Sequence, residues 1–265
     1  MINLYKSRTF VSYQGKCPMN CKHCYAHELE YSSNSNCISE VVNEVDKQEF
    51  DIIYVSQRYE NFYDEEKGVS LCQALYERHH KDLLIITRSY LSDRLVEKLV
   101  QLNKTMQCRG NQLYLAVSIC AEQSYSFTED ESVCPTPQQR LLNLKRVHPH
   151  HIKTLLFLRP VFPDKVIPAA ECISIIKQAK DFTDAVISSG LIVSDAILKR
   201  LGLEKASFAY LESGDSSYLA DLNQDDILYM DVENELQMIQ NECEFFGIPF
   251  FRHSMPALNY LLAAS

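Results

Sequence analysis

The chain has 265 residues, 46% of them hydrophobic and 23% charged, and its 26 basic and 35 acidic side chains give a formal net charge of −9. This apolar fraction can offset the entropy of ordering the chain, which excludes a disordered protein. No stretch approaches the roughly 18 apolar residues of a membrane-spanning helix, and residues Met1 to Phe10 hold no signal-peptide core. We therefore expect a cytoplasmic protein, and the acidic balance argues against broad, charge-driven binding of nucleic acid.

Short apolar runs alternate with helical patterns, which predicts an α/β fold with a parallel sheet. The six predicted strands are Phe10–Tyr13, Ile52–Val55, Leu83–Thr87, Leu113–Ser118, Thr154–Leu158 and Ala185–Ser188. Predicted helices between them include one with Leu91, Leu95, Leu99 and Leu102 on one face, one capped at Thr136, and one that begins at Pro168. A full eight-stranded barrel needs about 250 residues, so six βα units in residues 1–202 predict a partial, TIM-like barrel.

The segment after residue 202 is less regular. Ser213 to Ser217 predict a loop, and a helix from about Met230 to Phe246 is expected to end at Gly247. Phe250, Phe251 and Met255 then give an apolar end. We expect residues 203–265 to be a short C-terminal α/β extension that packs on the barrel core of residues 1–202.

Cys17, Cys21 and Cys24 stand out among the ten cysteines because they form a CxxxCxxC motif. Three thiolates this close converge around a shared centre, and soft metal centres are what thiolates bind best. Zinc normally takes a fourth ligand, and there is no second CxxC, but His23 or His27 leaves a Cys3His zinc site open. An iron–sulfur cubane normally takes four cysteines, so three would leave one iron with an open position.

The active site of a parallel barrel lies at the carboxyl ends of its strands. The segments that follow the predicted strands are Lys16 to Tyr25, Ser56 to Asp64, Arg88 and Ser89, Ser118 to Cys120, Arg159, and Ser188 to Leu191. They are polar and mixed in charge, which suits a zwitterionic ligand, and the three cysteines fall among them.

A CxxxCxxC motif after a first short strand resembles the signature of the radical S-adenosylmethionine enzymes. In that family three cysteines hold a [4Fe–4S] cluster, and the amino and carboxylate groups of S-adenosylmethionine bind its fourth iron. One electron then cleaves the cofactor, and the resulting 5′-deoxyadenosyl radical abstracts hydrogen from a substrate. The resemblance implies one such cluster on Cys17, Cys21 and Cys24, S-adenosylmethionine as the second cofactor, and an external one-electron reductant of the flavodoxin or ferredoxin type.

The strand ends resemble the branch of this family that is related to spore photoproduct lyase. The similar segments are Val55 to Glu60 where most members carry a GGE-type motif, Ile86 to Ser89, Val117 to Ile119, and Leu158 to Pro163. The resemblance implies that Ser56, Arg88 and Ser118 contact the methionyl group or ribose. It also implies that His23 lies beside the adenine, and that Arg159 reaches the carboxylate or the substrate.

The lyase returns a hydrogen atom from a cysteine just beyond its second strand, and residues 56–66 hold no cysteine here. We therefore expect a different substrate. Cys120, which ends the fourth strand, is a candidate hydrogen donor, although a buried structural cysteine is the other interpretation.

Two substrate classes stay open at this point. A nucleotide or nucleic acid follows from the resemblance to the lyase, and a peptide or small metabolite follows from the acidic charge. A separate hypothesis is a non-catalytic iron–sulfur or zinc protein that acts as a sensor or interaction partner. Tyr5, Lys6, Arg8, Lys16 and Lys22 form a modest basic patch where the reductant is expected to dock.

Overall fold

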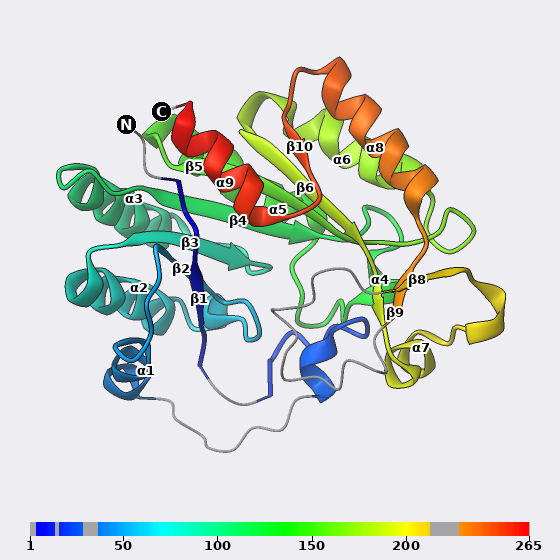
Figure 1. The fold of residues 1–265 in the computed structure, drawn as a ribbon, viewed down its shortest axis with the longest axis horizontal. Coiled ribbons are helices and arrows are strands. Elements are labelled where there is room, and N and C mark those ends of the chain that lie inside the picture. Colours follow the sequence, from blue (N-terminus) through cyan, green and yellow to red (C-terminus); the bar gives the residue numbers. More distant parts are fainter. Residues whose placement is uncertain (1–3, 14–15, 29–36, 213–227, 265) are drawn as a thin grey trace.

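The computed structural model describes residues 4–13, 16–28, 37–212 and 228–264. Its centre is one sheet of seven strands in the order β1-β2-β3-β4-β5-β6-β10, and every neighbouring pair is parallel (Figure 1). The strands are β1 (Arg8–Val11), β2 (Ile52–Val55), β3 (Asp82–Thr87), β4 (Leu113–Ile119), β5 (Lys153–Val161), β6 (Ala185–Gly190) and β10 (Phe250–Phe251). The order follows the chain and the sheet is not closed, which confirms the predicted α/β partial barrel.

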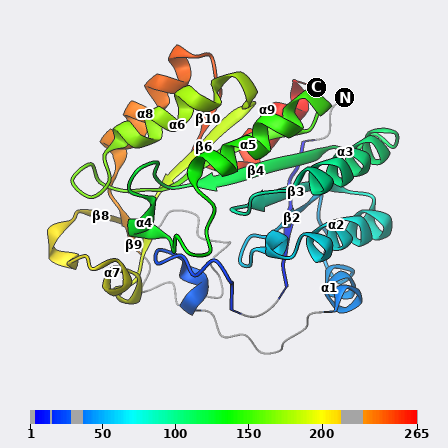
Figure 2. The same cartoon turned by 180° about the vertical axis from the view of Figure 1, so that it is seen from behind.

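Most helices cover one face of the sheet, as the view from behind shows (Figure 2). They are α1 (Ile38–Val45), α2 (Glu65–His79), α3 (Asp93–Gln107), α5 (Pro137–Val147), α6 (Ala169–Ala179) and α8 (Glu233–Phe245). Their apolar faces pack on Val, Ile and Leu side chains of the strands in one large core. The capping box predicted at Thr136 is confirmed, since its hydroxyl accepts from the Gln139 amide while the Gln139 side chain accepts from the Thr136 amide.

Helix α9 (Ser254–Ala263) lies alone on the opposite, inner face of the sheet (Figure 1). Its Ala257, Leu258 and Leu261 pack against aromatic side chains near the amino ends of the strands. The side chain of Asn259 accepts a hydrogen bond from the Tyr5 amide (2.7 Å) and donates one to the Tyr5 carbonyl (3.1 Å). The two ends of the described chain therefore meet, and α9 fills the part of the barrel interior that lies near the amino ends of the strands.

Three short strands form a second, antiparallel sheet in the order β7-β9-β8. They are β7 (Ile192–Val193), β8 (Tyr210–Glu212) and β9 (Leu228–Met230). Two short helices, α4 (Tyr125–Thr128) and α7 (Asp195–Leu201), lie near the carboxyl ends of the strands. Gly190 allows β9 to pass close to β6, because a Cβ at this position would lie 2.8 Å from the Met230 carbonyl oxygen.

Three elements near the ends of the chain differ from the sequence prediction. The first strand is Arg8–Val11 rather than Phe10–Tyr13, because Arg8 pairs with Ile52 and the Tyr13 amide instead donates to the Asn61 side chain. Met230 belongs to β9, so the predicted helix begins only at Glu233. The apolar end at Phe250 and Phe251 is a seventh strand, which is too short to show any pattern.

The boundary at residue 202 stays a prediction. The segment on its carboxyl side contributes β10 to the main sheet, and β8 and β9 join β7 from the other side of the boundary. The predicted loop Ser213–Ser217 lies outside the described residues. None of the described helices combines the length and apolar character that crossing a membrane requires.

Candidate functional site

A cavity of about 530 Å³ opens at the carboxyl ends of the strands. Its wall is built by the cysteine loop, by residues at the ends of β2, β3 and β6, and by residues within β4 and β5. Arg159, which the sequence places after its strand, lies within β5 because this strand extends to Val161. The predicted site residues in this wall are Cys17, Cys21, His23, Cys24, Ser56, Arg88, Ser118 and Arg159. Cys120 is not among the described residues that line the cavity.

Backbone contacts hold the cysteine loop over the cavity. Asn20 adopts the left-handed conformation (φ 49°) that asparagine tolerates better than most residues. The Lys22 amide donates to the Thr128 carbonyl (2.8 Å), and Arg200 of α7 donates to the carbonyls of Lys22 and Cys24 (both 2.9 Å). The loop is therefore fixed from two sides.

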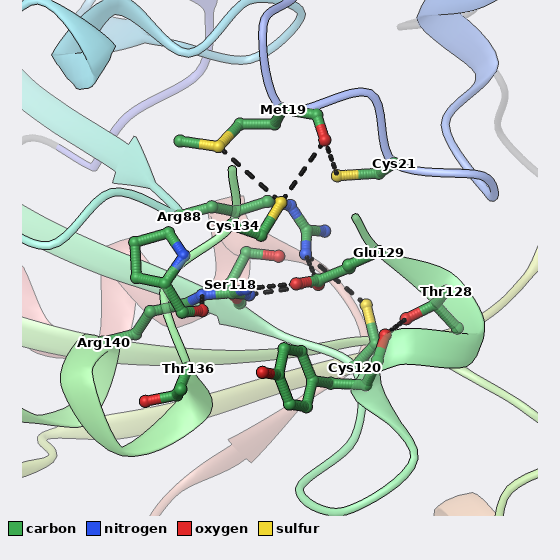
Figure 3. A network of polar contacts seen from close by, with 12 residues as sticks. Met19, Cys21, Arg88, Ser118, Cys120, Thr128, Glu129, Cys134, Thr136 and Arg140 are labelled. Carbon is green, nitrogen blue, oxygen red and sulfur yellow. Dashed lines mark hydrogen bonds and ion pairs between the residues drawn. The ribbon is translucent and has the colours of Figure 1, made fainter. Parts of the chain in front are cut away.

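The three thiols lie in a buried setting. Burial raises the pKa of Cys17, and it raises the pKa of Cys24 to about 12. Such thiols stay protonated at neutral pH unless a metal centre replaces the proton. Cys21 lies against Met19 and Cys134, whose sulfur is 3.3 Å from the Met19 carbonyl oxygen (Figure 3).

Neither nearby histidine completes a zinc site with these thiols. His27 Nε2 lies 3.1 Å from the Cys21 carbonyl oxygen, and His23 Nε2 lies 3.2 Å from Arg88 Nη2. Within the described part of the chain, no three Cys, His, Asp or Glu side chains are grouped around a single ion position. A four-iron cluster takes one thiolate per iron, so its thiolates need not meet at one ion.

Arg88, directly after β3, contacts three side chains around the wall. Its Nη1 is 2.5 Å from Glu129 Oε1 and 3.6 Å from the Cys120 sulfur, while its Nη2 faces His23. Burial and the Arg88 charge lower the pKa of His23 to about 3. The imidazole is therefore neutral and presents an uncharged ring to the cavity.

Glu129 lies between two guanidinium groups (Figure 3). It pairs with Arg88 and also with Arg140 of α5, and the side chains of Glu129 and Arg140 are both fully buried. Arg140 also donates to the carbonyl oxygen of Ser118 at 2.9 Å. Burial raises the pKa of Glu129, but the charges of Arg88 and Arg140 outweigh it and hold that pKa below its usual value. The carboxylate therefore stays ionised and fixes both arginines.

Glu60 organises the other side of the cavity. Its carboxyl group accepts hydrogen bonds from the Arg88 amide (2.7 Å), the Thr87 hydroxyl (2.9 Å) and the Phe62 amide (3.1 Å). Nearby Ser56 has a positive φ of 72°, uncommon for a residue with a side chain, and its hydroxyl accepts from the Asn61 amide. The loop after β2 is thereby tied to the end of β3.

No protein-family model matches this chain, and no curated protein matches it in sequence. Solved structures do match. A spore photoproduct lyase variant superposes with a TM-score of 0.65 at 11% identity, covering 95% of this chain and 78% of the lyase. SuiB of Streptococcus suis, bound to precursor peptide SuiA, and anSMEcpe with bound AdoMet both give a TM-score of 0.57 at 12% identity. The match covers 96% of this chain and 50% of SuiB, and 93% of this chain and 63% of anSMEcpe.

All three are radical S-adenosylmethionine enzymes. The chain has the radical S-adenosylmethionine fold. At these identities the likeness establishes the fold, and the roles of the individual residues stay predictions. The cavity lies at the carboxyl ends of the strands, where the sequence predicts the active site.

Cys120 is only 1% exposed, and its thiol donates to the Arg159 carbonyl oxygen at 3.2 Å, behind the ring of His23. Its role as a hydrogen donor stays a prediction, which this burial does not favour. Glu129 and Arg140 were missed from the sequence. Arg140 did carry a signal, because it shares the inward face of its helix with Leu141, Leu144 and Val147.

Proposed function

We propose that the chain is a radical S-adenosylmethionine enzyme with one [4Fe–4S] cluster held by Cys17, Cys21 and Cys24. The observation that carries the proposal is the position of the CxxxCxxC loop on the wall of a cavity at the strand ends of a radical S-adenosylmethionine fold. When bound, the reduced cluster would supply the electron that cleaves S-adenosylmethionine, and the resulting 5′-deoxyadenosyl radical would take a hydrogen atom from an organic substrate.

The donor set and the space fit these two groups. One buried and two half-buried cysteines on one loop suit iron, and neither neighbouring histidine competes for the same position. A volume of about 530 Å³ lies within the range of cavities that hold cofactors.

The side chains of the wall bind and orient the cofactor in this proposal. The neutral ring of His23 offers a flat surface to the adenine, and Ser56 and Ser118 offer hydroxyl groups to the ribose or methionyl group. Arg88 supplies donors for the carboxylate, and Arg159 reaches the same carboxylate or the substrate. Glu129 is a positioning residue, because it contacts Arg88 from behind and restricts its rotamer.

Partners follow from the same chemistry. An external one-electron reductant of the flavodoxin or ferredoxin type would reduce the cluster, and we expect the protein to be cytoplasmic. Related folds act on both substrate classes left open by the sequence, since the lyase is seen with a dinucleoside spore photoproduct and SuiB with a precursor peptide.

The test is anaerobic. The protein is reconstituted with iron and sulfide, reduced with dithionite, and mixed with S-adenosylmethionine, and 5′-deoxyadenosine is measured by chromatography. We expect product from the natural chain and background levels from the Cys17→Ala, Cys21→Ala and Cys24→Ala variants. Cys108→Ala is the matched control, because Cys108 is exposed at the end of α3.

The proposal would be contradicted if the three cysteine-loop variants formed as much 5′-deoxyadenosine as the natural chain and the Cys108→Ala control. A protein that contains zinc and shows no visible absorption of an iron–sulfur cluster would also contradict the proposal and would favour a zinc protein. A stable cluster that never yields 5′-deoxyadenosine would favour a non-catalytic iron–sulfur sensor.

A further inference from the structure

A second cavity of about 290 Å³ adjoins the first. The two cavities share part of their wall, formed by Gln57, Arg159, Ser189 and Gly190. The rest of the second cavity is lined from β1, β2, β8 and β9, from the segment that follows β10, and from the beginnings of α8 and α9. A molecule bound here can therefore extend toward the cysteine loop.

The lining of the second cavity is positively charged. Its described charged side chains are Arg8, Arg159, Arg252 and Glu233, a formal charge of +2 with His253 neutral. Glu233 pairs with Arg252 at 2.7 Å. The whole chain has a formal charge of −9, so this is a local concentration of positive charge in an acidic protein.

Two of these arginines lie on aromatic rings. The Arg8 guanidinium carbon is 5.2 Å from the centre of the Phe10 ring and 5.5 Å from that of Tyr54. The Arg159 carbon is 4.1 Å above Phe157. A ring contacts the face of a guanidinium, whereas its N–H groups lie in its plane, where they match the oxygens of a carboxylate or phosphate.

The interior of a parallel barrel is normally filled by branched apolar side chains. In β1 the alternation of side chains leaves Arg8 and Phe10 half-buried while Thr9 and Val11 are buried. Arg8 donates a hydrogen bond to the Tyr54 hydroxyl group, and a bound anion would add charge-assisted hydrogen bonds to the same half-buried guanidinium group. From the sequence, Arg8 is assigned to a modest basic patch where the reductant is expected to dock, and the structure places Arg8 in the lining of this cavity.

We propose that the second cavity binds the carboxylate or phosphate group of the substrate, so that the substrate is a small organic anion anchored by Arg8 and Arg159. That the bound anion is the substrate rests on the proposed function, whereas the existence of an anion site does not. The anchored group would hold the remainder of the molecule toward the first cavity.

The experiment is isothermal titration of the full, reconstituted chain with three probes of similar size: phenyl phosphate, benzoate and the neutral benzyl alcohol. We expect one saturable site for each anion and at least about tenfold weaker binding of benzyl alcohol. Arg8→Gln is expected to weaken the binding of both anions about tenfold or more, and Arg8→Lys, which keeps the charge but loses the planar group, is expected to weaken it less than Arg8→Gln does. Arg109→Gln is the control, because Arg109 is an exposed arginine beside His80, outside both cavities.

Three results would overturn the anion site: no saturable binding of either anion at millimolar concentration, equal affinity for benzyl alcohol, or an equal loss in Arg109→Gln. Unfolding curves of the two Arg8 variants show whether a loss of binding is a loss of fold, and Arg8→Lys keeps the test valid if Arg8→Gln does not fold. Measuring 5′-deoxyadenosine on the same preparation separates the two proposals. Anion binding without 5′-deoxyadenosine would support the anion site and contradict the proposed function. Formation of 5′-deoxyadenosine without anion binding would support the proposed function and contradict the anion site.

Discussion

Glu129 and Arg140 form an ion pair that is completely buried behind the wall of the first cavity. Arg140 also donates to the carbonyl oxygen of Ser118, and Glu129 Oε1 accepts from both Arg88 and Arg140. The pair therefore connects helix α5 to the ends of β3 and β4, both of which contribute side chains to the candidate site. Its integrity matters for stability and for the placement of Arg88.

Replacing Glu129 by Gln is expected to lower the free energy of unfolding by about 3–5 kcal/mol, because it leaves the buried Arg140 charge without its partner. Urea unfolding followed by circular dichroism measures the change. The control is Arg78→Gln, which breaks the exposed pair with Asp46 and is expected to cost less than about 1 kcal/mol. Equal losses in the two variants would show that the Glu129 pair is not buried in solution.

The stability contributed by Glu129 is expected to depend on pH. Its pKa is depressed in the folded chain, so its contribution is present above the pKa of the unfolded carboxyl group, about 4.3, and is lost as the pH falls through the folded value. The difference in unfolding free energy between the natural chain and Glu129→Gln should stay constant from neutral pH to about pH 4.3, and it should decrease at lower pH.

Burial raises the pKa of Glu60, so Glu60 changes stability with pH in the opposite direction. This effect is present in both the natural chain and the variant, and it cancels when their unfolding free energies are subtracted. A gap that widened as the pH fell below about 4.3 would contradict the assigned direction.

Local pattern was sufficient to predict the central strands of the sheet and the cysteine loop. Ile52–Val55 and Leu113–Ser118 are continuous apolar runs, and three cysteines at ligand spacing are visible without any tertiary information. Glu129 could not be found in this way, because its role depends on two arginines that lie 41 and 11 residues away in sequence. The position of Arg8 in the second cavity could not be predicted for a related reason, since only the register of β1 with β2 decides which side chains enter the barrel interior.

Cys134 tests whether the cluster uses only the predicted cysteines. Its sulfur lies 3.7 Å from the Met19 sulfur, next to Cys21, yet the proposal gives it no ligand role. We expect Cys134→Ala to keep the iron content and visible absorption of the natural chain, whereas Cys21→Ala loses both. Loss of iron in Cys134→Ala, with an unchanged unfolding midpoint, would identify Cys134 as a fourth ligand.

Arg88 is expected to act in cofactor binding. Arg88→Lys keeps the positive charge beside Glu129 but loses the planar group that reaches Glu129, His23 and Cys120 together. The KM for S-adenosylmethionine should rise about tenfold or more, since a hydrogen bond to a charged group contributes about 1.5–3 kcal/mol.

Iron content should stay unchanged in this variant, because no cluster ligand is altered. Arg94→Lys, at an exposed position of α3, is the control and should leave the KM unchanged. An unchanged KM in Arg88→Lys would remove Arg88 from the cofactor site.

Helix α9 is expected to belong to the same cooperative unit as the barrel. Leu258 is fully buried against the inner face of the sheet, so Leu258→Ala should cost about 2–5 kcal/mol. The same substitution at Leu142, which is 44% exposed on α5, is the matched control and should cost less than about 1 kcal/mol. If residues 203–265 unfolded separately, Leu258→Ala would split the urea transition in two. We expect a single transition at lower urea, because Asn259 joins this segment to Tyr5, ahead of β1, and β10 pairs with β6.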